Sequence, residues 1–156
     1  MYQDLSFMKI PLPEDVLKLK NYGDYAGAQK MIRYFLEHKE IPKALRKRLE
    51  IEQEIIGVMG ADEYPYTYAE ALEMMTSHLR DFKEEELQYL KEIGAADWMY
   101  IDGEVHFQRL FYDNLTQTRP DLAARVIVQN EELEKENAMK QKLLNGNVHY
   151  MKEHGG

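Results

Sequence analysis

Apolar residues recur at every third or fourth position along most of this chain, which is the spacing of helices that bury one face. Several of these segments begin at a residue that caps helices well and end at a glycine or an asparagine. The predicted fold class is therefore mainly α, a helical bundle of about six to seven helices with a long C-terminal helix. Met59 and Leu110 are among the side chains expected to face inward. The predicted helices cover residues 14–20, 24–38, 42–60, 67–80, 81–94, 107–116 and 120–144.

The strongest β signal lies in the segment Trp98–Phe107. An Asp-Gly pair at 102–103 is typical of a two-residue type I′ turn, which fixes the register of a β-hairpin. An isolated hairpin is marginal in water, so its apolar side is expected to pack on the helices. The residues of that side are Trp98, Tyr100, Val105 and Phe107. The mixed side carries Met99, Ile101, Glu104 and His106.

Two helix starts carry the capping-box signature, in which a side-chain oxygen and a carboxylate satisfy backbone amides at the start of a helix. Thr67 with Glu70 forms one box, and Asp81 with Glu84 is expected to form another. The two capped helices and the hairpin follow one another over residues 67–107. This is the element order of a winged helix-turn-helix, so the sequence predicts a winged-helix-like segment there.

The charge pattern argues against nucleic acid as a partner. The chain has 20 basic and 28 acidic residues, a formal net charge of −8. The would-be recognition helix, residues 83–92, has four acidic residues against two basic ones, and such a face repels phosphate. The basic residues of the segment 43–48 can pair with glutamates one turn later on a solvated helix. We expect no nucleic-acid partner, and a winged-helix nucleic-acid-binding module stays as an alternative function.

The composition excludes several kinds of chemistry. The 156-residue chain has no cysteine, which excludes disulfides, thiolate metal sites and a cysteine nucleophile, and which fits a reducing compartment. The first residues lack the basic start and apolar stretch of a signal peptide, and no apolar run approaches the ~20 residues that span a bilayer. We therefore expect a cytoplasmic protein with no membrane as a partner.

The sequence also lacks recognisable arrangements of reactive side chains. None of the five histidines pairs at i+4 around a glutamate or follows a glutamate by three positions, so zinc and di-iron patterns are absent. The serines, Ser6 and Ser77, are not in a Gly-x-Ser-x-Gly elbow, and there is no glycine-rich phosphate loop. We expect no catalytic residue, no metal and no cofactor, so the chain by itself is not expected to be an enzyme.

The last predicted helix changes character along its length. Its first turns carry an apolar stripe, whereas residues 131–137 leave almost no apolar face. A helix that is polar all round often bridges between domains. We therefore divide the chain into a helical domain, residues 1–118 with the hairpin at 98–107, and a long helix and tail, residues 119–156, which can connect to a further domain.

Two groups of side chains are candidates for contact with a protein partner. Tyr64 and Tyr66 lie in a turn, and tyrosine is common at interfaces; these side chains can equally pack in the core, and the sequence does not separate the two interpretations. Asn130, Glu134 and Asn137 lie on the polar part of the last helix. This helix can contact a partner domain or pair with its own copy, which would make a stand-alone helical homo-oligomer.

Two resemblances to known families can be drawn from short motifs. Residues 21–28, Asn-Tyr-Gly-Asp-Tyr-Ala-Gly-Ala, are similar to the motif that opens the second helix of a tetratricopeptide (TPR) unit. Three segments in order are residues 42–50, the Tyr-Pro-Tyr turn at 64–66, and Ala-Asp-Trp at 96–98 leading into the hairpin. In this order they resemble the helical N-terminal domain that precedes the catalytic core in bacterial transglutaminase-like proteins.

The second resemblance implies a function. The catalytic core of that family uses a Cys, His and Asp triad for acyl transfer or amide hydrolysis, and none of these roles can be assigned here because the chain has no cysteine. The resemblance implies a non-catalytic accessory or protein-interaction domain, the N-terminal part of a transglutaminase-like protein. Its expected partner is a downstream catalytic domain after residue 156, reached through the helix over residues 120–144.

Overall fold

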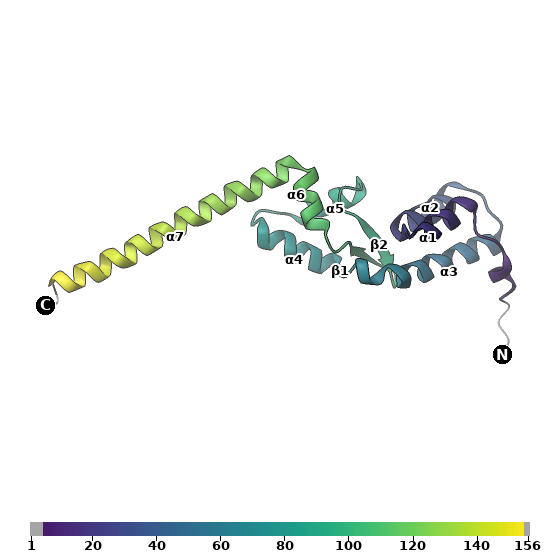
Figure 1. Ribbon diagram of the computed structural model, residues 1–156, viewed down its shortest axis with the longest axis horizontal. Helices are drawn as coiled ribbons and strands as arrows, with labels where there is room; N and C mark the ends of the chain where they lie inside the picture. Colours follow the sequence, from purple (N-terminus) through teal and green to yellow (C-terminus); the bar gives the residue numbers. More distant parts are fainter. Residues whose placement is uncertain (1–4, 155–156) are drawn as a thin grey trace.

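The structure, a computed structural model, describes residues 5–154, with side chains over residues 5–145. The outermost residues of the two predicted units, 1–4 and 155–156, lie outside this range. Within it the chain forms seven α-helices and a three-stranded antiparallel sheet, and it ends in a long helix (Figure 1). The predicted fold class is confirmed.

Short connections join the elements along the chain. The helices are α1 (Glu14–Tyr22), α2 (Tyr25–His38), α3 (Lys43–Gly60), α4 (Tyr68–His78), α5 (Glu84–Glu92), α6 (Phe111–Thr118) and α7 (Pro120–His154). The strands are β1 (Tyr66–Thr67), β2 (Trp98–Ile101) and β3 (Glu104–Phe107). Two 3-10 turns complete the chain, η1 (Ser6–Lys9) and η2 (Ala61–Glu63).

Several predicted helix boundaries are wrong. α7 runs on to His154 instead of ending near residue 144. One glycine and its neighbouring asparagines cost roughly 1 kcal/mol each or less in a helix, and a helix that is already formed needs no new nucleus to pass them. α6 begins at Phe111 because β3 takes the residues up to Phe107. Leu110 therefore precedes the helix and is exposed, as is Met59 near the end of α3.

The hairpin register is confirmed, and the sheet contains one strand more than predicted. Trp98 opposes Phe107 and Tyr100 opposes Val105, as the Asp-Gly turn requires. β1 pairs with the other side of β3, with Tyr66 opposite Phe107. A strand of two residues is too short to show the alternation of apolar and polar side chains, so the sequence indicated only a turn at β1. The sheet order is β1-β3-β2, which leaves β2 at an edge.

The sheet lies between two hydrophobic cores. The apolar side of the hairpin contributes Phe107 to one of them, and the mixed side contributes Met99 and Ile101 to the other, so both sides are used. The first, here called the winged-helix core, consists of Ala71, Met75, Leu79, Phe82, Leu87, Leu90, Ala96, Phe107, Phe111, Leu115 and Leu122. The second, here called the N-terminal core, consists of Val16, Ala28, Ile32, Leu49, Ile56, Tyr64, Met99 and Ile101.

The elements from α3 to β3 have the connectivity of a winged helix. A helix, a short strand, two helices and a hairpin follow in that order, and the first strand pairs with the last. Two helices precede this unit in the chain: α1 packs on α2, and α2 packs on α3 (Figure 1). The helices α2 and α3 also contact β2, on the mixed side of the hairpin. Gly23 adopts a φ of 91° between α1 and α2, a conformation that favours glycine at a helix end.

Candidate functional site

Of the two predicted contact tyrosines, the structure buries Tyr64 and leaves Tyr66 partly buried. Tyr64 is buried in the N-terminal core, and its hydroxyl donates a 2.6 Å hydrogen bond to a carboxylate oxygen of Asp97. Burial and the nearby Asp97 carboxylate raise the pKa of Tyr64 far above its usual value. Tyr66 lies in β1 with its ring edge-on to Phe111. Core packing, one of the two interpretations left open by the sequence, accounts for both side chains.

A buried amide fastens the edge of the sheet to the N-terminal helices. Gln29 on α2 is fully buried, and its Nε2 donates hydrogen bonds to the carbonyl oxygens of Gln53 and Tyr100, at 3.0 and 2.8 Å. Its Oε1 accepts a 2.7 Å bond from the backbone N–H of Tyr100. Because β2 is an edge strand, these groups have no neighbouring strand to bond to. One side chain therefore takes the place of a fourth strand.

A buried ion cluster joins α1 to α3. Glu52 on α3 is 1% exposed, and its two carboxylate oxygens meet Lys20 Nζ at 2.5 Å and Arg48 Nη1 at 2.6 Å. Burial alone raises the pKa of Glu52, but the hydrogen bonds and charges of Lys20 and Arg48 outweigh burial and lower it. This carboxylate is paired with two cations of the same core, so we assign it to the fold.

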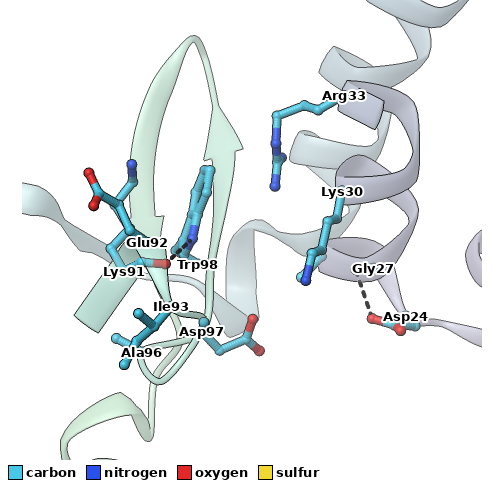
Figure 2. Close-up of a pocket in the computed structure, with 12 residues that line it drawn as sticks. Asp24, Gly27, Lys30, Arg33, Lys91, Glu92, Ile93, Ala96, Asp97 and Trp98 are labelled. Carbon is cyan, nitrogen blue, oxygen red and sulfur yellow. Dashed lines mark hydrogen bonds between the residues drawn. The ribbon is translucent and has the colours of Figure 1, made fainter. Parts of the chain in front are cut away.

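A cleft of about 450 Å³ opens between α2 and the junction of α5 with β2 (Figure 2). Lys30 and Arg33 reach into it from α2, and Lys91 and Trp98 line the other wall. Its two walls are about 60 residues apart along the chain, so no local motif could have indicated it. The volume is within the range of sites for small molecules.

The single tryptophan of the chain forms the centre of this cleft. Its ring lies between two cations: the guanidinium carbon of Arg33 is 4.4 Å from the ring centroid, and Lys91 Nζ is 4.5 Å from it (Figure 2). The Trp98 indole N–H donates to the carbonyl oxygen of Lys91. Burial lowers the pKa of Arg33, with Tyr100 and Glu37 acting in the opposite direction. The Trp98 ring and the Arg33 guanidinium are thus in cation–π contact.

The first half of α7 is attached to the winged-helix unit. Leu122 is buried in the winged-helix core. Arg125 donates to Glu86 at 2.7 Å and to Asp81 at 3.2 Å, and Gln129 bonds to Asp81 at 2.6 Å. The last contact is an exposed pair at 3.5 Å between Arg80 and Glu136. These contacts cover about the first half of the helix.

The outer half of α7 extends away from the rest of the molecule (Figure 1). A 35-residue helix is about 52 Å long, so the half beyond Glu136 projects by more than 20 Å. Met139, Leu143 and Leu144 are between 60 and 66% exposed on this half. The predicted contact residues Asn130, Glu134 and Asn137 are exposed on the same helix. The structure thus provides an unpartnered helical surface that carries apolar side chains.

The helix in the position of a recognition helix, α5, has an acidic exposed face. Tyr68, Glu84, Glu85, Gln88, Tyr89 and Glu92 line a shallow depression there. The carboxylate of Glu86 caps α5 by accepting from the backbone N–H of Lys83, so the capping box predicted at Asp81 and Glu84 is wrong.

The described part of the chain contains neither a group of metal ligands nor a membrane-spanning helix. Over these residues, no three histidine, aspartate or glutamate side chains lie together as metal ligands would. His149 and His154 lie beyond the described side chains. No described helix combines the length and the apolar character needed to cross a bilayer. Comparisons with protein-family models, with curated proteins and with solved structures gave no match.

Proposed function

We propose that this chain is a non-catalytic protein-interaction module that contacts its partner through the outer half of α7. The observation that carries the proposal is the exposure of Met139, Leu143 and Leu144 on α7, beyond the contacts that attach its first half. Large apolar side chains grouped on an exposed surface often mark an interaction site. A second helix laid along α7 would bury them, as helices in coiled coils do.

A second copy of the chain provides a helix of suitable chemistry. Leu133, Glu136, Lys140, Leu143 and Leu144 recur at spacings of three and four, so they share one stripe of α7. In an antiparallel pair centred near residue 138, Glu136 of each copy faces Lys140 of the other. Leu133 of each copy then faces the two leucines of the other. The stripe is therefore complementary to itself in charge and in apolar contact, as a two-fold interface requires.

Light scattering at increasing protein concentration tests this proposal. We expect the mass to rise from monomer to dimer, and the double change Leu143→Glu with Leu144→Glu to keep the chain monomeric by placing two charges in the apolar contact. The matched control is Ile127→Glu with Val128→Glu, an adjacent exposed apolar pair nearer the start of α7 and outside the stripe, which should leave dimerisation unchanged. A wild-type chain that stays monomeric at every concentration contradicts a second copy as the partner.

A transglutaminase-like catalytic domain is the other partner to be considered, and it rests on the sequence resemblance alone. In this form of the proposal the chain is the N-terminal accessory part of a cytoplasmic enzyme, and the same outer half of α7 contacts the catalytic domain. The proposed lack of activity in this chain is supported by the absence of a cysteine nucleophile from the sequence and by the use of Glu52 and Tyr64 in contacts of the fold. Measurable transglutaminase or protease turnover by this chain, if a single side-chain substitution abolished it, would contradict the proposed lack of activity.

The winged-helix connectivity favours nucleic-acid binding as a second candidate function. The charge of α5 opposes it, because Glu84, Glu85 and Glu92 stand where a recognition helix presents basic or neutral side chains. We predict no saturable binding to random duplex DNA at low salt, measured by fluorescence anisotropy. Tight binding that weakens steeply with added salt would instead establish a phosphate-binding surface.

A further inference from the structure

In the cleft around Trp98, the carboxylates accept hydrogen bonds whereas the cations have no anionic partner within the described chain. No carboxylate of the described residues lies within 4.0 Å of the charged groups of Lys30, Arg33 or Lys91. Nη1 of Arg33 is buried and has no hydrogen-bond partner. A buried donor without an acceptor costs about 1–3 kcal/mol, and more when it is charged. The cleft therefore has spare positive donors.

The acidic groups of the same cleft are already engaged by neutral donors. Asp24 accepts from the backbone N–H of Gly27, at the start of α2, and Asp97 accepts from the hydroxyl of Tyr64 (Figure 2 shows the first of these bonds). Glu92 accepts from the side-chain amide of Gln88. These carboxylates keep their negative charge, but none lies within 4.0 Å of the charged groups of the three cations, which have free N–H groups. What the three cations lack is an anionic acceptor at ion-pair distance.

We propose that this cleft binds the carboxylate or phosphate group of a small molecule, with Arg33 and Lys30 as the donors. A guanidinium presents two parallel N–H groups that match two oxygens of either anion, and such charge-assisted bonds are among the strongest hydrogen bonds in proteins. Arg33 is held for this role by its stacking on Trp98 and by its contact with the Tyr100 ring at 5.3 Å. Lys30 is exposed at the mouth of the cleft, where it can approach a bound anion.

The fluorescence of Trp98 reports on this site directly, because the chain has no other tryptophan. Inorganic phosphate and succinate are titrated separately into the protein, with sodium chloride adjusted to keep the ionic strength constant. We expect a saturable change in Trp98 emission as the anion draws the guanidinium of Arg33 toward itself. Saturation by only one of the two compounds assigns the site to phosphate or to carboxylate groups. No saturable change with either compound overturns the proposal.

Two substitutions and one control locate the binding. Arg33→Gln should weaken it about tenfold or more, in line with the loss of charge-assisted bonds. Lys30→Gln, at an exposed position where unfolding is not expected, should weaken it severalfold. Lys18→Gln removes the same charge from an exposed lysine that pairs with Glu14 on α1, and should leave binding unchanged. If Lys30→Gln and Arg33→Gln bind as the wild type does, the anion binds elsewhere and the proposal is wrong.

Discussion

Replacing Gln29 by methionine should lower the free energy of unfolding by about 3 kcal/mol, because three buried hydrogen bonds are lost at about 1 kcal/mol each. Methionine has a similar length and fills the same space, so the change in stability reports the loss of the amide hydrogen bonds and not a loss of packing. The backbone N–H and carbonyl of Tyr100 lose their partner in the edge of the sheet. Urea denaturation measures the loss, and hydrogen exchange should show a faster amide at Tyr100.

The control for this experiment is Gln88→Met on α5. Gln88 is exposed, and its one side-chain hydrogen bond, to Glu92, is at the surface. We expect a change within about 0.5 kcal/mol, as for most surface substitutions. Equal effects of the two changes would mean that the Gln29 amide does not fasten the sheet edge to α2 and α3.

Replacing Glu52 by glutamine should cost about 2–4 kcal/mol at neutral pH. Removal of the carboxylate leaves Lys20 and Arg48 without their anionic partner in a largely buried place. Glu14→Gln is the matched control, since Glu14 also pairs with a lysine, at 3.1 Å, but both side chains are more than 70% exposed. We expect the control to change stability by less than about 0.5 kcal/mol in urea denaturation.

The same carboxylate predicts a pH dependence. Its pKa is lower in the folded state than in the unfolded chain, so the unfolded state binds the proton more readily. The contribution of Glu52 to stability is therefore complete above about pH 4.5, the ordinary range of a glutamate, and is lost as the pH falls through the folded-state value. In Glu52→Gln the acid loss of stability should be shallower than in the wild type. An identical acid slope in the two proteins would contradict this assignment.

The local features of the fold could be predicted from the sequence. The Asp-Gly turn fixed the hairpin register, and Thr67 with Glu70 forms the expected capping box. These features depend on neighbours within four residues, and the required residue types are few. The capping box predicted at Asp81 failed because Asp81 instead pairs with Arg125 and Gln129, more than 40 residues away.

Polar residues with distant partners could not be predicted. Gln29 and Glu52 are polar, so a hydrophobic pattern assigns them to the solvent side of their helices, although both are buried. Arg48 lies one helical turn from Glu52, as the sequence indicates, but Lys20 lies on another helix. The Tyr100 partner of Gln29 is 71 residues away, and no periodicity links these distant partners. The cleft around Trp98 was missed for the same reason. The one available signal was that the only tryptophan lies at the start of the hairpin.

Charge reversal at Glu136 and Lys140 of α7 tests most directly whether this chain works through that helix. Lys140→Glu gives a stripe with two negative charges, and Glu136→Lys gives one with two positive charges, so each variant alone should repel its own copy and remain monomeric. Mixed in equal amounts, the two variants should form a heterodimer of the wild-type dimer mass in light scattering, because every facing pair is again opposite in charge. Dimers of either variant alone, or a mixture that stays monomeric beside a dimeric wild type, would contradict the proposed pairing.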